Sequence, residues 1–176
     1  MQYEAVGYLV LPLLPGMAAE IKRIIGRREL VSFPLLKLQN IEAKIDTGAF
    51  TSAIHCTKIE EVTCPDGTRI IRFRLLDPSH PQYHQQEFEF SRYSVRDIKS
   101  SFGQVQERFI IRTQIQLFDE IIEADFSLSD RSDLKYPVLI GRALLQNNFI
   151  VDVSKKEVAR KQKIKTRNQK RKDKKL

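Results

Sequence analysis

The chain of 176 residues contains no tryptophan and only two cysteines, Cys56 and Cys64. Two cysteines cannot build the disulfide framework of a small secreted protein, so we expect a reducing, cytoplasmic compartment. Long apolar runs are also missing: the stretch at residues 6–14 is interrupted by Pro12 and is too short to cross a bilayer. No basic residue precedes it, which makes it a poor signal peptide, and we expect no membrane partner.

Two common ligand-binding motifs are absent as well. The sequence has no Gly-x-x-x-x-Gly-Lys-Ser/Thr loop for nucleotide phosphates and no His-Glu-x-x-His helix for zinc. A zinc site remains a minor alternative, because two histidines with His-x3-His spacing and two thiols are available: His80, His84, Cys56 and Cys64. Pro81 opposes a helix that would place both imidazoles on one face. We therefore predict neither a metal nor a cofactor.

Positive charge is concentrated at the C-terminal end. The whole chain has a net charge of +8, but residues 155–176 alone carry +10, so the first 154 residues carry −2. This basic segment has almost no apolar periodicity, and we predict a disordered tail or a frayed helix. Two interpretations stay open: an electrostatic contact with RNA, a ribosome or an acidic peptide, or a solvated tail that only improves solubility.

The spacing of apolar residues predicts mostly strands. A short N-terminal helix is predicted at residues 17–25, with Gly26 as its stop, and one helical turn at 142–146. Strands are predicted at 29–38, 41–45, 51–56, 69–75, 86–90, 108–118, 121–128, 138–140 and 149–153. Many short strands with little helix predict an all-β, barrel-like fold. We divide the chain into an N-terminal extension (1–23), one domain (24–154) and the basic tail (155–176).

The most informative stretch is an Asp-Thr-Gly triplet at positions 46–48, directly after the alternating run at 41–45. Alone the triplet is a weak signal, since three common residues recur by chance and often mark an ordinary turn. It becomes more specific because a second short strand, 138–140, is followed by Gly141 and an arginine. This order is the layout of one half of an aspartic peptidase site. The alternative is a capped turn and an ordinary strand end.

The chemistry of such a site requires two carboxylates that share one proton. One carboxylate takes a proton from water, while the other, protonated, polarises the scissile carbonyl. Asp46 carries the predicted catalytic carboxylate; Gly48 lets the chain turn sharply, and the Thr47 hydroxyl bonds the backbone of the turn. The nearest alternative partner, Asp130, lacks the glycine and the turn pattern. A symmetric homodimer with one Asp46 from each subunit is therefore the economical solution.

Longer segments resemble a known family. Residues 138–153 (VLIGRALLQNNFIVDV) resemble the C-terminal strand, glycine and helix of retropepsins. Residues 43–55 (AKIDTGAFTSAIH) more specifically resemble a bacterial family named ATP-dependent zinc proteases, which includes RimB-like proteins. Segments 24–34, 100–113 and 128–142 also fit this pattern. The resemblance implies a closed retropepsin barrel, a homodimer and peptide hydrolysis by paired aspartates. In the RimB-like branch it further implies action on glutamate tails of a ribosomal protein.

Four further residues are candidates for substrate binding. In retropepsins the place of residues 99–104 belongs to the flap, a hairpin that closes over substrate, so Ser101 and Gly103 would offer backbone groups to an extended peptide. The alternative is an ordinary surface hairpin. His55 occupies a position shared with the family and could contact substrate, although a lone strand histidine is more often structural. Arg131 would suit an acidic peptide if exposed, or else pair with an acid inside its turn.

Two functions from different classes follow from these patterns. The first is a cytoplasmic, homodimeric aspartic endopeptidase that cleaves peptides or proteins, with glutamate-rich substrates as a weaker extension. The second is a non-catalytic RNA- or ribosome-binding protein that uses the basic tail on a retropepsin scaffold. The weakness of the second is that the tail has no aromatic residue for stacking on bases.

Overall fold

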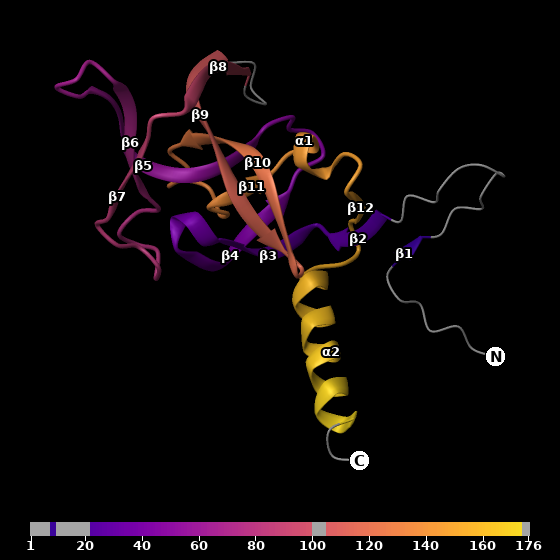
Figure 1. The fold of residues 1–176 in the computed structure, drawn as a ribbon. Coiled ribbons are helices and arrows are strands. Elements are labelled where there is room, and N and C mark those ends of the chain that lie inside the picture. The colour runs from indigo at the N-terminus through magenta and orange to yellow at the C-terminus, as the bar shows by residue number, and fades with distance from the viewer. Residues whose placement is uncertain (1–7, 10–21, 100–104, 174–176) are drawn as a thin grey trace, which may run out of the picture.

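A closed β-barrel forms the centre of the molecule (Figure 1). The structure, a computed structural model, describes residues 8–9, 22–99 and 105–173. The ring of the barrel consists of β3 (Arg28–Phe33), β4 (Leu38–Ile45), β5 (Ser52–Thr63), β9 (Val105–Leu117), β10 (Glu120–Ser129) and β11 (Val138–Ile140). These strands pair in the order β10-β9-β3-β4-β11-β5, and parallel pairing of β10 with β5 closes the ring. The predicted all-β barrel is confirmed.

Further strands and helices extend from this ring. β6 (Arg69–Leu75) and β7 (Glu87–Phe90) continue the sheet beyond β5, and β8 (Tyr93–Lys99) pairs with β9. A separate sheet contains β1 (Tyr8–Leu9), β2 (Lys22–Gly26) and β12 (Phe149–Asp152). The helical elements are the 3-10 turn η1 (Pro34–Leu36) and the helices α1 (Arg142–Leu145) and α2 (Val158–Asp173). The predicted helical turn near position 142 is thereby confirmed.

Aliphatic and phenylalanine side chains fill the barrel. Successive strand residues point to opposite faces, so alternating apolar positions such as Ile41, Ala43 and Ile45 of β4 all turn inward and are buried. Phe33 and Phe126 meet edge to face inside, with ring centroids 5.1 Å apart and both side chains fully buried. Phenylalanine thus supplies the bulky core groups in a chain without tryptophan.

The predicted N-terminal helix at residues 17–25 is wrong where the structure describes it. Residues 22–26 form strand β2, which pairs in parallel with β12, so that Ile24 lies opposite Ile150. The helical spacing of apolar residues here is overridden by this pairing, which satisfies the backbone of both strands and buries Ile25. Residues 17–21 lie outside the described part of the chain.

The basic tail, predicted as disordered or frayed, forms helix α2 over Val158–Asp173. Its first turn is fixed by the fully buried carboxylate of Glu29, which accepts hydrogen bonds from the backbone N–H groups of Val158 (3.0 Å), Ala159 (3.1 Å) and Gly26 (2.7 Å). A carboxylate is favourable at this position because the first N–H groups of a helix have no partner within it. This anchor could not be predicted from the sequence, because Glu29 precedes the helix by 129 residues.

Removing the charge of Glu29 should release the start of α2. A Glu29→Gln side chain keeps one acceptor oxygen but turns an amide NH2 toward backbone donors, so we expect unfolding free energy to fall by about 2–3 kcal/mol. Thermal unfolding followed by circular dichroism, and faster hydrogen exchange at Val158 and Ala159, would report the loss. The matched control is Glu123→Gln, because Glu123 is exposed and lies 3.9 Å from its arginine partner. Equal losses in both variants would contradict the anchoring role.

Candidate active site

The end of strand β4 positions Asp46. β4 runs parallel to β11, with Ile45 opposite Ile140, and the Asp46 N–H donates to the Ile140 carbonyl at 2.9 Å. β11 also pairs with β5, antiparallel, with Leu139 opposite Ala53. Asp46 therefore leaves the barrel directly beside the second predicted motif, as the sequence pattern required.

The Asp46 carboxylate holds its own loop. Its Oδ1 accepts hydrogen bonds from the backbone N–H groups of Gly48 (3.0 Å) and Ala49 (3.3 Å), and Oδ2 lies 3.4 Å from the Lys44 ammonium. The side chain is 27% exposed, so it is open to solvent while remaining fixed. The predicted hydrogen bond of the Thr47 hydroxyl to the turn is not among those formed by the described residues, where Thr47 is exposed.

Gly48 acts differently from the sequence prediction. Among the described glycines, only Gly67 has a positive φ, so Gly48 does not supply a left-handed turn. A Cβ at Gly48 would lie 3.3 Å from Oδ1 of Asp46, which is a tight approach. The absence of a side chain here keeps space beside the carboxylate.

Gly141 is required by close packing behind the loop. A Cβ at this position would lie 2.6 Å from the carbonyl oxygen of Phe50, a distance that backbone atoms do not tolerate. The Gly141 N–H donates to the Ser52 hydroxyl at 3.1 Å, and the next N–H, of Arg142, donates to the Ala49 carbonyl at 2.8 Å. The two sequence motifs are thus joined by hydrogen bonds into one unit.

His55 lies inside the protein, and both of its ring nitrogens form hydrogen bonds. Nδ1 accepts a hydrogen bond from the Arg131 N–H at 2.9 Å, so the ring proton is on Nε2, which lies 2.9 Å from the Asp77 carboxylate. Hydrogen bonds from Ser79, and then from His55, lower the pKa of Asp77. With 3% of its side chain exposed, His55 is placed to hold the loop of Arg131.

Arg131 lies within electrostatic reach of Asp46. Burial and the charge of Arg108 lower the pKa of Arg131, while the charge of Asp46 raises it. Its Nε donates to the Tyr136 carbonyl at 3.2 Å, which orients the guanidinium. Arg108, in β9, is half-buried, and this burial lowers its pKa. Sequence reasoning missed Arg108, since nothing distinguishes it from the other basic residues of its strand.

The predicted flap corresponds to a hairpin. β8 and β9 pair antiparallel up to Lys99 opposite Val105. Ser101 and Gly103 lie outside the described residues. The substrate contacts proposed for these two residues stay a prediction.

The candidate zinc residues do not converge. Cys56 is buried in the core, and burial raises the pKa of its thiol well above the usual value. Cys64 lies just beyond the end of β5. The Nδ1 atom of His80 is already engaged, because it accepts a hydrogen bond from the Gln82 N–H at 3.1 Å. Within residues 22–99 and 105–173, no three His, Cys, Asp or Glu side chains lie close enough to hold a metal ion.

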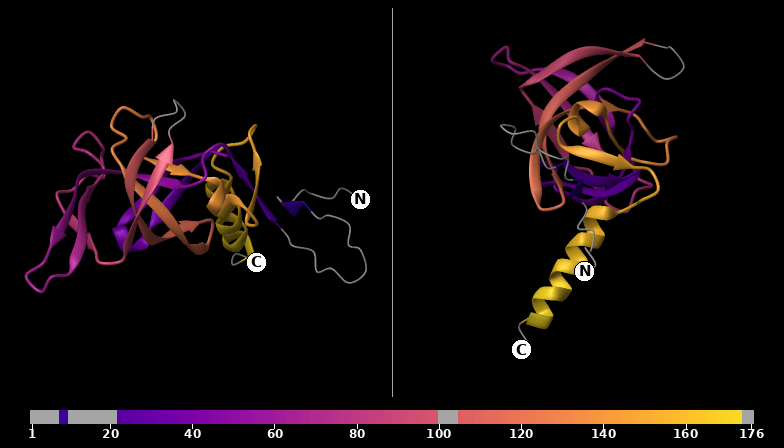
Figure 2. Two further views of the ribbon diagram at one scale, coloured as in Figure 1. Left: turned by 90° about the horizontal axis from the view of Figure 1, so that it is seen from above. Right: turned by 90° about the vertical axis from the view of Figure 1, so that its right-hand side faces the viewer.

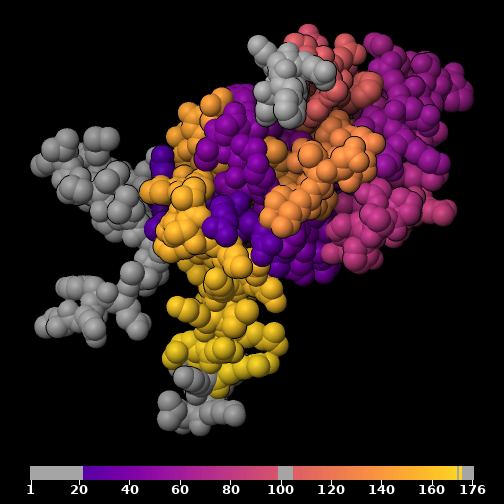
Figure 3. Space-filling view, turned by 180° about the vertical axis from the view of Figure 1, so that it is seen from behind, coloured from indigo at the N-terminus to yellow at the C-terminus, as the bar shows by residue number. Residues whose placement is uncertain are grey.

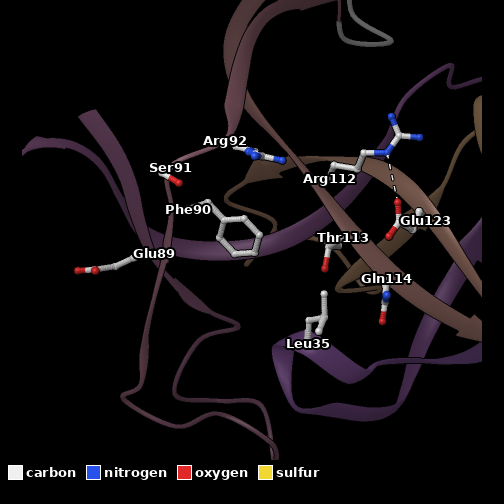
Figure 4. A pocket seen from close by; sticks show the side chains of 9 residues that line it. All are labelled: Leu35, Glu89, Phe90, Ser91, Arg92, Arg112, Thr113, Gln114 and Glu123. Atoms are coloured by element: carbon white, nitrogen blue, oxygen red, sulfur yellow. Dashed lines mark ion pairs between the residues drawn. The ribbon is translucent and has the colours of Figure 1, made fainter. Parts of the chain in front are cut away.

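A separate pocket is lined by neither Asp46 nor the two arginines Arg108 and Arg131 (Figure 4). Phe90, Leu35 and Thr113 form its middle, and the buried Thr113 hydroxyl has no hydrogen-bond partner. Arg112 at the rim pairs with Glu123 at 3.9 Å. With acidic and basic groups both present, the lining favours no charge class of ligand.

Comparisons with known proteins agree with the motif and the barrel. Residues 24–162 match the model of the RimB-like family, described as "Retropepsin-like aspartic endopeptidase RimB". A Shewanella halifaxensis protein named "Probable alpha-L-glutamate ligase" is 34% identical over 137 residues, which cover 76% of this chain and 29% of that protein. A protein of the same name from Desulfotalea psychrophila is 32% identical over 141 residues, covering 74% and 28%.

The ligase-named relatives are much longer than this chain, which spans less than a third of their length. Among solved structures, a Legionella pneumophila protein of unknown function is similar in fold, with a TM-score of 0.56 and 24% identity. That likeness covers 77% of this chain and 97% of the other. Among the described residues, no helix is long and apolar enough to cross a membrane. The family match over most of the barrel, together with the Asp46 loop, shows that the chain belongs to the RimB-like family of retropepsin-like aspartic endopeptidases.

Proposed function

We propose that this protein is a cytoplasmic aspartic endopeptidase whose active site takes one Asp46 from each subunit of a homodimer. The observation that carries the proposal is the Asp46 loop itself. One carboxylate oxygen is fixed by two backbone N–H groups, and the side chain still faces solvent at the end of a barrel strand. Such a fixed but accessible carboxylate suits acid–base work on a bound water.

Within the described residues of one subunit, the alternative partner Asp130 is engaged in its own turn. Asp130 accepts a hydrogen bond from the Ser132 N–H at 2.9 Å and lies 3.8 Å from Nδ1 of His55. The hydrogen bonds of Ser132 lower the pKa of Asp130 and tie its carboxylate to its own turn. Thr47 and Phe50 are exposed beside Asp46, and a second copy of the loop would cover them. A two-fold axis between the loops would then bring the two Asp46 carboxylates together.

In this dyad the two carboxylates share one proton and act as a unit. The ionised member takes a proton from a water molecule, whose oxygen attacks the scissile carbonyl carbon. The protonated member gives its proton to the carbonyl oxygen, which yields a tetrahedral gem-diol intermediate. When this intermediate collapses, the C–N bond breaks and the amine leaves with the proton that the first carboxylate took from water. A hydroxyl proton of the gem-diol returns to the second carboxylate, which restores the starting state of the dyad. No metal ion takes part in these steps.

Acidic peptides are the proposed substrate class. The charge of Asp46 acts on Arg131, and the charge of Arg108 acts on Arg131 as well. An arginine fork binds a carboxylate through two parallel hydrogen bonds, so this pair of arginines suits acidic side chains of a substrate. The name of the ligase relatives points in the same direction, because a glutamate ligase would make glutamate tails that this domain could cut. In those relatives, we assign ligation to the part of the chain outside the match. We therefore propose glutamate-tailed peptides or proteins as preferred substrates.

The test is cleavage of matched peptides that carry either an oligoglutamate or an oligoglutamine tail, between pH 4 and 8, with and without EDTA. We expect cleavage that resists EDTA and is faster for the glutamate tail. Loss of activity in EDTA would contradict the metal-free mechanism. Equal rates for both tails would contradict the acidic substrate, and no cleavage of any peptide would contradict the endopeptidase.

Neutralising the two arginines should change substrate choice more than general activity. For Arg131→Gln or Arg108→Gln we expect kcat/KM on the glutamate-tailed peptide to fall about 10- to 100-fold, because a hydrogen bond to a charged group contributes about 1.5–3 kcal/mol. The rate on the glutamine-tailed peptide should stay within about threefold. Arg112→Gln is the matched control, since Arg112 lies on the same strand as Arg108 and is 69% exposed. A similar fall in the control would contradict the role given to the two arginines.

A further inference from the structure

Helix α2 is an exposed basic rod attached to the barrel only at its base. It projects away from the barrel in Figure 1 and in the right panel of Figure 2, and from behind it extends below the other elements (Figure 3). Ala159 in the first turn is buried, whereas the positions from Lys163 to Gln169 are all exposed. Sixteen residues give the rod a length of about 24 Å. Such a surface needs a partner or serves only solubility.

The exposed basic side chains form two stripes along α2. At about 3.6 residues per turn, one stripe consists of Arg160, Lys163, Arg167 and Arg171, and the other contains Lys161 and Lys165. Between the stripes lie Ile164 and Asn168; Gln162 and Thr166 occupy the opposite side. Among the described residues, Arg160 alone of this set has an acidic partner, Glu157 at 3.2 Å. Almost all of this charge is therefore available to a ligand.

We propose that α2 binds double-stranded RNA by bridging its two phosphate strands, one with each basic stripe. The A-form duplex has a deep, narrow major groove, so phosphates of both strands lie near one another across it. A helix that contacts only phosphates needs no side chains that read bases, and α2 has no aromatic residue for stacking on single strands. The proposal goes beyond peptidase activity and does not depend on it.

Other partners fit this surface less well. An extended acidic peptide follows one line and would use one stripe while leaving the other unpaired. A membrane surface requires an apolar face opposite the charges, but Ile164 is the sole large aliphatic residue after the first turn of α2. Two separated stripes of like charge match two phosphate strands better than either alternative.

The base of the helix gives this surface a fixed direction. Glu29 binds the first N–H groups of α2, and Arg28 Nη2 lies 2.7 Å from the Glu157 carboxylate just before the helix. Both anchors belong to β3, which pairs with β4, the strand that ends at Asp46. RNA held by α2 would therefore be held in a defined orientation relative to the Asp46 loop.

The experiment measures binding of the full chain to a fluorescent 20-base-pair RNA duplex as salt is raised. If six basic groups replace counterions, affinity should fall about 10³-fold between 50 and 200 mM salt. Replacing Arg160, Lys163, Arg167 and Arg171 by Gln should weaken binding at least about 30-fold and lower the salt slope by about 4. Glutamine is a good helix former, so circular dichroism should show that α2 persists.

The matched control removes the same charge elsewhere, by replacing Lys58, Arg69, Arg112 and Lys135, all exposed, with Gln. We expect this control to change affinity by less than about threefold. Equal weakening in both variants would overturn the proposal, because only net charge would then matter. Tighter binding to an oligoglutamate peptide, to a duplex of DNA or to single-stranded RNA than to the RNA duplex would overturn it as well.

Discussion

Replacing Asp46 by asparagine is expected to lower kcat/KM for peptide cleavage by about 10⁴-fold or more. Losses of this size follow when one member of a set of catalytic residues that act as a unit is removed. The loop should keep its shape, because the asparagine oxygen can still accept the hydrogen bonds of Gly48 and Ala49. The amide cannot take a proton from water, so the chemical step is lost while the fold remains. The measurement is steady-state cleavage of the preferred tailed peptide.

A control separates loss of chemistry from loss of structure. The Asp46→Asn variant should unfold at the same temperature as the wild type and retain its oligomeric state. Asp130→Asn removes the nearest alternative carboxylate, and cleavage should stay within about tenfold of the wild type. If Asp130→Asn were as inactive as Asp46→Asn, the dyad would form within one subunit.

The second large effect is expected at Gly141, where alanine should destabilise the protein by about 3 kcal/mol. Its Cβ would lie 2.6 Å from the Phe50 carbonyl oxygen and 2.8 Å from the Thr51 carbonyl carbon. Both belong to backbone of the Asp46 loop, which must move to make room. We therefore expect cleavage to be lost even under conditions where most of the variant is folded. Chemical denaturation and activity should be measured on the same samples.

Arg142→Ala is the control for this position. Arg142 is adjacent to Gly141 and exposed, and its backbone N–H makes the hydrogen bond to the loop, which alanine retains. Its unfolding free energy should change by less than about 0.5 kcal/mol. A stable and active Gly141→Ala variant would contradict the close approach of the two motifs.

Local pattern predicted much of the fold and the meeting of the Asp46 loop with the strand and glycine at 138–141. Alternation of apolar and polar residues in segments such as Leu38–Ile45 indicates a strand, because one face of each barrel strand is buried in the core. Gly141 could be predicted because strand, glycine and helical turn are consecutive in sequence. These features depend on neighbours along the chain.

The misses all depend on contacts between distant segments. Strand β2 is set by pairing with β12, and helix α2 starts where the Glu29 carboxylate meets it. Arg108 of β9 acts electrostatically on Arg131, which belongs to a different segment of the chain. The spacing of apolar residues along the chain carries no information on such distant partners. The basic segment 155–176 has almost no apolar periodicity, and for this reason the sequence alone predicts a disordered tail or a frayed helix.

The central claim, a dyad built from two subunits, is tested most directly by mixing subunits. Wild-type and Asp46→Asn chains are unfolded together in equal amounts and refolded, and cleavage is compared with wild type at the same total concentration. If each active site needs Asp46 from both subunits, about one quarter of the activity should remain, because mixed dimers are inactive. About one half would remain if each subunit carried a complete site, and that result would contradict the shared dyad.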